Sequence, residues 1–225
     1  MASYTLPISR VSQPYCIEGI VRLRINTKWH NQGRVVTIEE RARTLAFISW
    51  KIAAGLVLDM ENEEFQTDSQ AMRLEMIKEA CAFLVSVTDR LVASQHTNEE
   101  RQEMITKMAL KLVKDMQDNG DDLLGKGQDY QTPFINLLNE RMSEYSECSW
   151  DEVKEEPNFR YKRIFGDAMS KVMGVKDNKW ISQHMIEIEI PEMLANLKKG
   201  KASMVDGKSD VSEERALRKS NRGED

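Results

Sequence analysis

The fold is decided by the stretch from Thr37 to Met60, which reads TIEERARTLAFISWKIAAGLVLDM. Thr37 is followed three residues later by Glu40, and this is the spacing of a capping box. In that motif the threonine hydroxyl accepts a backbone N–H of the first helical turn, and the glutamate reaches back to the threonine N–H. A broad apolar surface follows, so we expect a long helix over 38–60 that lies centrally in the protein.

Two further segments begin in the same way, at intervals of thirty residues. Thr67 is followed by Gln70, and Thr97 is followed by Glu100, each before an amphipathic run. The core positions of the three segments do not match one another, so they indicate three helices of similar length and not a solenoid repeat. The helices predicted after the second and third threonine cover 68–94 and 98–118.

The second half of the chain contains shorter helical patterns separated by glycine and proline. Thr132 and Pro133 are typical of an N-cap and a first helical residue. Ser149 with Glu152 has the capping-box spacing and predicts a short helix that ends at Pro157. The other predicted helices cover 132–145, 159–173, 177–189 and 191–199, and the predicted stops are Asn119-Gly120, Gly174 and Gly200.

The two ends of the chain differ from this helical region in composition. Residues 1–36 contain five basic residues and one acidic residue, a local charge of +4, whereas the whole chain carries −5. Val21, Leu23 and Ile25 alternate with polar residues, which predicts an extended arm or a short β-hairpin. Residues 200–225 have little apolar content and predict a disordered tail.

We therefore expect a mostly α protein with one bundle of five to seven helices. The predicted organisation is a basic arm or hairpin over 1–36, a helical bundle over 37–199 and a disordered tail over 200–225.

The sparse cysteines and the first residues bear on where the protein resides. Cys16, Cys81 and Cys148 form no C-x-x-C motif, which favours a reducing compartment. The opening sequence MASYTLPISR lacks the apolar region of a secretory signal. The most apolar window, 45–58, is shorter than the roughly 20 residues that cross a bilayer. We predict a cytoplasmic protein without a membrane span.

The histidines, cysteines and glycines do not form a recognisable catalytic or metal motif. His184 with Glu187, and His96 with Glu100, would share a helical face, but two ligands do not make a metal site. The glycine spacing at 120–127 is that of a phosphate-binding loop, but no Ser or Thr follows Lys126. We predict no cofactor and no metal, and lean against an enzyme. A helical ligand pocket with enzymatic activity, using His184 and Cys148, is one alternative.

Basic residues near aromatic residues suggest another alternative, the binding of nucleic acid or another polyanion. The candidate residues are Arg22, Arg24 and Lys28 in the arm, and Arg160, Lys162 and Arg163 in a predicted helix. The acidic sequence, with a pI of about 5.5, argues against this function, because nucleic-acid domains tend to be basic. A basic arm can instead dock on an acidic surface of its own protein.

The function that the sequence favours is a non-enzymatic interaction or assembly protein of the cytoplasm. We expect its partner to be another protein or a second copy of the chain, as in a homodimer.

Overall fold

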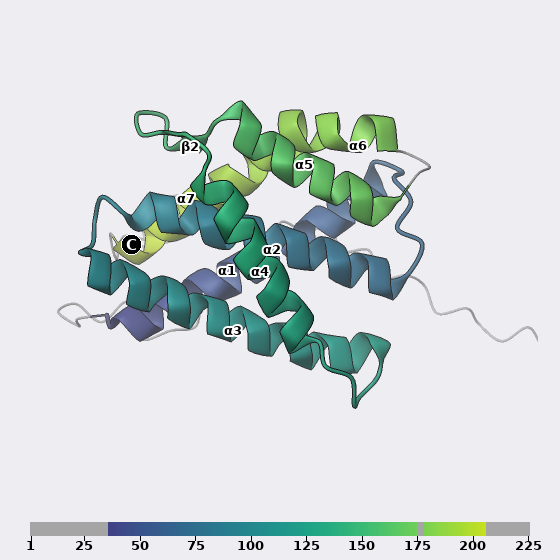
Figure 1. Cartoon of the computed structure of the whole chain (residues 1–225), viewed down its shortest axis with the longest axis horizontal. Helices are drawn as coiled ribbons and strands as arrows, with labels where there is room; N and C mark the ends of the chain where they lie inside the picture. The colour runs from purple at the N-terminus through teal and green to yellow at the C-terminus, as the bar shows by residue number, and fades with distance from the viewer. Residues whose placement is uncertain (1–35, 175–177, 206–225) are drawn as a thin grey trace, which may run out of the picture.

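The computed structural model of this chain describes residues 36–174 and 178–205, and these form a helical bundle (Figure 1). This confirms the predicted mostly α, single-bundle fold class. The predicted arm or hairpin over 1–36 and most of the predicted tail lie outside the described residues. The helices are α1 (Ile38–Asn62), α2 (Gln70–Val92), α3 (Asn98–Leu124), α4 (Gln131–Ser146), α5 (Phe159–Met173), α6 (Asn178–His184) and α7 (Ile190–Val205). A π-helical segment, η2 (Met185–Glu189), joins α6 to α7, and two short strands, β1 (Trp150–Asp151) and β2 (Glu156–Pro157), pair in an antiparallel hairpin.

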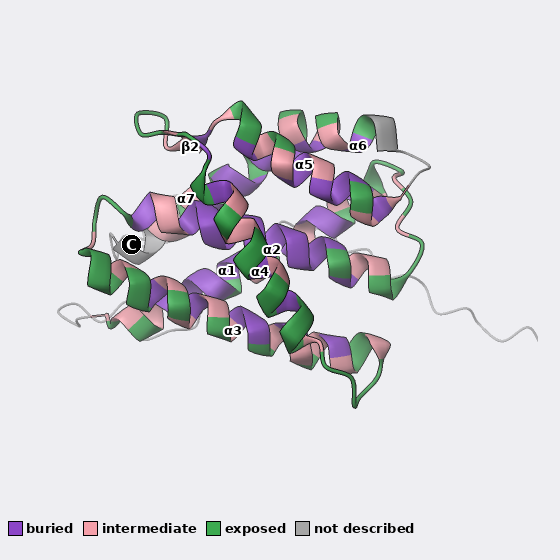
Figure 2. Ribbon diagram, in the orientation of Figure 1, coloured by how far each residue is buried: buried purple, intermediate pink, exposed green. Residues whose placement is uncertain are grey.

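The centre of the bundle is α2, which packs against α1, α3, α4 and α5. Most of its residues are buried (Figure 2). We had expected the central place for the helix over 38–60. That helix, α1, contributes to the core, but Phe47 and Leu58 on its outer side remain exposed. In α2 small and apolar residues occupy every side, so other helices can cover it all round.

The core around α2 contains a cluster of four buried aromatic rings. Phe83 of α2 stacks on Phe165 with a centroid distance of 4.5 Å, and meets Tyr145 and Tyr161 edge to face. The two tyrosine rings stack on each other at 4.3 Å. These contacts join α2, α4 and α5, and aromatic pairs in such geometries contribute beyond their buried area.

The predicted helix starts are correct at two of the three threonines. Thr37 and Thr97 form capping boxes with Glu40 and Glu100, at the starts of α1 and α3. The prediction for Thr67 is wrong, because Ser69 caps α2 by accepting the backbone N–H of Met72 at 3.1 Å. The hydroxyl of Thr67 donates instead to the carboxylate of Glu61.

Two predictions in the middle of the chain are also corrected. The stop at Asn119-Gly120 is wrong, because α3 continues to Leu124 and ends before Gly125, whose φ is +110°. The side chain of Asn119 bonds the helix carbonyl of Asp115 at 2.7 Å, so it supports the helix at this point. The cap of α4 comes from the Asp129 carboxylate, which accepts the backbone N–H of Thr132 at 3.0 Å.

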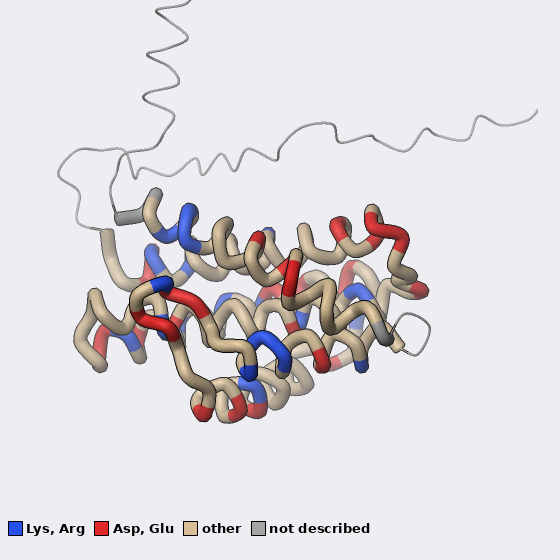
Figure 3. Tube along the Cα trace, turned by 90° about the horizontal axis from the view of Figure 1, so that it is seen from above, with Lys and Arg blue, Asp and Glu red and all other residues tan. Residues whose placement is uncertain are grey.

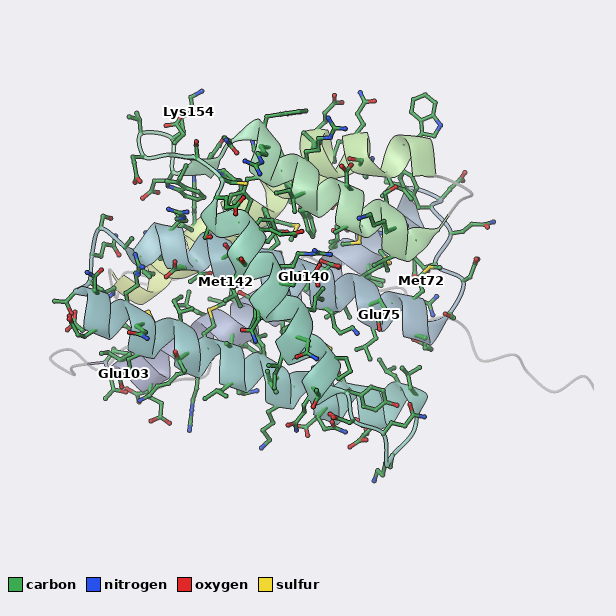
Figure 4. All side chains as sticks on the ribbon, viewed as in Figure 1. Met72, Glu75, Glu103, Glu140, Met142 and Lys154 are labelled. Carbon is green, nitrogen blue, oxygen red and sulfur yellow. The ribbon has the colours of Figure 1, made fainter. Side chains whose placement is uncertain are left out.

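The segment after Ser149 is a hairpin and not the predicted short helix. The Asp151 carboxylate accepts the backbone N–H groups of Val153 and Lys154, each at 3.0 Å, and this closes a turn. Glu155 has a φ of +52°, which a helix does not allow. Lys154 in this turn lies at the edge of the molecule (Figure 4).

The end of the described chain is one continuous helix through α6, η2 and α7. The predicted break before Pro191 and the predicted stop at Gly200 are therefore wrong. A Cβ at Gly200 would lie 2.9 Å from Cδ1 of Ile48, so the absent side chain lets α7 approach α1 closely. Lys201 then donates to the carbonyl of Leu91 at 2.7 Å, which fixes the helix beyond its predicted end.

No helix in the described part of the chain is both long enough and apolar enough to cross a membrane.

Candidate functional site

The last helix contains an irregular turn at η2. The backbone N–H of Ile190 donates to the carbonyl of Met185, five residues earlier, and Pro191 follows at the start of α7. In a regular α-helix, proline lacks the N–H for its hydrogen bond, and its ring collides with the carbonyl four residues before it. A wider π turn accommodates both effects. The irregularity is thus the local consequence of one proline inside a helical sequence.

This turn brings His184 and Glu189 together. Nε2 of His184 lies 2.9 Å from Oε1 of Glu189. In a regular α-helix, residues five apart point about 140° away from each other around the axis. A π turn, whose hydrogen bond spans five residues, winds more slowly and brings such residues closer to the same side. Only 11% of the His184 side chain and 4% of the Glu189 side chain are exposed. The pair is therefore held inside the protein.

Groups from neighbouring elements surround this pair. The ring of Phe65, just beyond α1, contacts the His184 ring with a centroid distance of 4.9 Å. Burial raises the pKa of Glu189; His184 partly opposes that shift, and the charges of Asp59 and Glu192 add to it. Burial, helped by the charge of Glu192, also raises the pKa of Asp59. Asp59 of α1 and Glu192 of α7 therefore lie close enough to Glu189 to disfavour its charge.

Large apolar side chains are exposed on the outside of these elements. The exposed fraction is 67% for Trp180, 52% for Ile188 and 57% for Leu58, which is the neighbour of Asp59 on α1. Glu187 and Glu192 are also exposed. Trp180, Glu187, Ile188 and Glu192 follow one another on the exposed side of one helix, and the charge of Glu192 reaches Asp59, the neighbour of Leu58 near the end of α1. We call these six residues the acidic–apolar face: Leu58, Asp59, Trp180, Glu187, Ile188 and Glu192.

Among the residues that the structure describes, the carboxylates of this face have no basic ion-pair partner. Over the described ranges 36–174 and 178–205, no lysine or arginine forms an ion pair with Asp59, Glu187 or Glu192. Glu187 accepts a hydrogen bond from the neutral amide of Gln183 at 3.0 Å. Charges of both signs are distributed over the helices (Figure 3), and carboxylates elsewhere do find cations, as Glu61 does with Arg73 at 2.6 Å.

The chemistry available here is proton binding and the recognition of a cation beside apolar groups. The described residues contain no group of three or more His, Cys, Asp or Glu side chains that could hold a metal ion. The His184–Glu189 pair can share a proton. The outer carboxylates can accept an ammonium or guanidinium group while the apolar side chains of the same ligand pack on Trp180 and Ile188.

The structure describes three of the six predicted polyanion-binding residues, those on α5. Arg22, Arg24 and Lys28 lie outside the described residues. The three residues predicted on α5 each lie beside a carboxylate, so their charge is locally balanced. The pairs are Arg160–Glu147 at 3.5 Å, Lys162–Glu156 at 3.6 Å and Arg163–Asp167 at 3.4 Å. Polyanion binding stays a prediction.

The other polar residues considered from the sequence lie in separate surroundings. Nδ1 of His96 is 3.5 Å from Glu100, the partner that helical spacing predicted. The thiol of Cys148 donates to the carbonyl of Glu144, and burial raises the pKa of that thiol. A buried thiol with a raised pKa is a poor nucleophile.

The sequence indicates His184 as a candidate polar group but predicts the wrong partner for it. The predicted partner is Glu187, because residues three apart share a face of an α-helix. The available signal was Pro191: a proline that follows an apolar helical pattern either starts a new helix or is absorbed by an irregular turn, and we had expected the first. Comparison of the chain with protein-family models, with curated proteins and with solved structures finds no match.

Proposed function

We propose that this chain is a non-enzymatic interaction protein of the cytoplasm, whose acidic–apolar face binds a basic amphipathic segment of a protein partner. The observation that carries the proposal is the exposure of Trp180 and Ile188 beside carboxylates that form no ion pair with a lysine or arginine of residues 36–174 and 178–205. Exposed apolar patches rimmed by polar residues are typical of protein–protein contact sites. Tryptophan is also enriched among the residues that dominate binding energy.

The basic character of the partner follows from the charges on the face. Burial, and after it the charge of Glu192, raise the pKa of Asp59. A lysine or arginine placed beside Asp59 and Glu192 would favour the ionised form of the Asp59 carboxyl. Because the outer groups are exposed to solvent, the attraction should mainly affect the association rate and should weaken with salt.

The proposed cytoplasmic location is supported by the thiols. Cys81 and Cys148 are both free and buried. Free thiols persist in compartments that glutathione and thioredoxin keep reduced.

A site-specific photo-cross-linker tests the proposal in living cells of the source organism. The reactive group would replace Ile188 in the full chain, and a control chain would carry it at Val153, which is 95% exposed in the hairpin turn. We expect a discrete cross-linked protein from position 188 and none of that size from position 153. Equal products from both positions, or no product from position 188, would overturn the proposal.

Charge variants make the test specific for the face. In the chain that carries the cross-linker at position 188, Glu187→Lys with Glu192→Lys should abolish the product. The matched control is Asp118→Lys with Asp122→Lys, which places the same charges on exposed positions of α3. A product that survives the first pair, or is lost with the second pair, would show that the charges of the face do not recognise the partner.

A further inference from the structure

The chain contains a segment with the chemistry that the acidic–apolar face would bind. Between residues 20 and 29, apolar Val21, Leu23 and Ile25 alternate with polar residues, and Trp29 ends the run. The positive charges of the segment are Arg22, Arg24 and Lys28. Both halves of the required pattern, apolar side chains and cations, are therefore present within ten residues.

This segment is close enough along the chain to reach the face of its own molecule. The helix α1 begins at Ile38, and the face begins at Leu58, twenty residues further along that helix. At 1.5 Å per residue this separation is about 30 Å. The ten to sixteen residues between positions 22–28 and Ile38 span up to about 33–53 Å when extended. A fully extended tether of this length therefore reaches the part of the face that α1 contributes, Leu58 and Asp59.

We propose that residues 20–29 occupy the acidic–apolar face of the same molecule and compete there with the external partner. This inference rests on the face assigned under the proposed function. The cations would pair with Asp59, Glu187 and Glu192, and the apolar side chains would cover Trp180 and Ile188. Since the segment is tethered, its effective concentration at the face is in the millimolar range, so an external segment must bind more tightly to displace it. The arm then acts as an inhibitor built into the chain.

Cross-linking of the purified full-length protein tests this occupancy. The photo-cross-linker again replaces Ile188, and an equal mixture of ¹⁵N-labelled and unlabelled protein is irradiated and digested. We expect mass spectrometry to find the group joined to peptides from residues 20–29, with one isotope in both peptides. Attachment elsewhere in the chain, or no attachment, would overturn the proposal. Hybrid pairs carrying both isotopes would also overturn it, because they would place the segment of a second copy on the face.

A charge-reversed arm provides the second measurement. Arg22→Glu, Arg24→Glu and Lys28→Glu together should lower the yield of the internal cross-link several-fold, and should raise the yield of the cross-link to the cellular partner. The control for the position of the charge is Arg10→Glu with Arg34→Glu, which reverses one basic residue on either side of the segment. Equal loss in both variants would overturn recognition by residues 20–29.

The two proposals can fail separately. If the purified chain joins residues 20–29 to position 188, but the charge-reversed chain captures no protein in cells, the internal contact stands and the external partner does not. If the cellular product forms and the internal product does not, the partner stands and the inhibitory arm does not.

Discussion

The helix α2 and the continuous helix α6–η2–α7 are both long, but they differ in how far other helices cover them and in how their buried glutamates are paired. α2 is covered by four other helices, and its buried Glu79 meets Arg141 through two hydrogen bonds of 2.8 Å. The last helix is covered on one side, and its buried Glu189 has His184 as its ion-pair partner, with other carboxylates nearby. A helix that other helices surround completely needs a regular helical backbone and an opposite charge for each buried charged group. A helix that is covered on one side only can contain a proline, a π turn and exposed apolar side chains. A binding surface can use these features.

The sharpest way to break this comparison is to remove one large apolar side chain from each helix. Phe83→Ala should lower the free energy of unfolding by about 4 kcal/mol, because the ring is fully buried in the aromatic cluster. Trp180→Ala should change it by less than about 0.5 kcal/mol, because that ring is exposed. Urea unfolding followed by circular dichroism measures both values. Similar losses in the two variants would contradict the division into a structural helix and a surface helix.

The next largest effect concerns the buried ion pair of α2. Arg141→Met should cost about 3 kcal/mol, because it leaves the carboxylate of Glu79, which is 5% exposed, without its cation. The same urea experiment measures the loss. Adding Glu79→Gln to this variant should restore part of the stability, since the unpaired charge is gone. A double variant less stable than Arg141→Met would show that the pair does not explain the loss.

The buried carboxyl group of the last helix, Glu189, should make the stability of the protein depend on pH. The pKa of Glu189 in the folded protein is raised above its ordinary value of 4.5. The folded state therefore holds this proton more tightly than the unfolded chain, so this group's contribution to stability falls as pH rises from the ordinary value through the raised one.

Glu189→Gln lacks this titration. Its free energy of unfolding, relative to the unmodified chain, should increase as pH rises across that window. Unfolding curves collected at a series of pH values test the sign, and Glu187→Gln controls for removal of a carboxylate from the exposed side of the same segment. A difference that falls with rising pH would contradict a raised pKa.

The smallest expected effect distinguishes the N-cap residues Thr37 and Ser69 from Thr67, which does not cap a helix. Thr37→Ala should cost about 1 kcal/mol, because the hydroxyl accepts the backbone N–H of Glu40 at the start of α1. Ser69→Ala should cost a similar amount at the start of α2. Thermal unfolding compares these variants with Thr67→Ala, whose loss should reflect only the bond to Glu61. A cap-sized loss of α2 helicity in Thr67→Ala but not in Ser69→Ala would contradict the assignment.

Much of the fold could be predicted because the signals for helices are local. The capping boxes at Thr37 and Thr97 need only four residues, and apolar periodicity needs a single helix. The predicted helix start was wrong where a second nearby side chain could also bond the backbone N–H groups. Thr67 and Ser69 can both cap, and the choice fell to Ser69 because Glu61, on another helix, bonds Thr67. Asp151 captured backbone N–H groups that a helix after Ser149 would have used.

The candidate site could not be predicted in the same way, because its residues come from distant parts of the chain. Leu58 and Asp59 stand on α1, more than a hundred residues before Glu187 and Glu192. The approach of α7 to α1 joins these groups, and it depends on packing at Gly200 and Ile48. The pairing of His184 with Glu189 further requires the π turn, which helical periodicity does not contain.

The π turn also rotates the contact stripe of the continuous helix, so that the stripe points in different directions before and after the turn. Before it, Ser182 donates to Asp167 of α5 at 2.8 Å; after it, Gly200 faces Ile48 of α1. One extra residue in a helix rotates everything that follows by about 100°. A continuous helix can thus direct its contact stripe toward one neighbour in its first half and toward another in its second half. Deleting one residue from Met185–Glu189 would restore a single periodicity, and the helix could then fit α5 or α1 but not both.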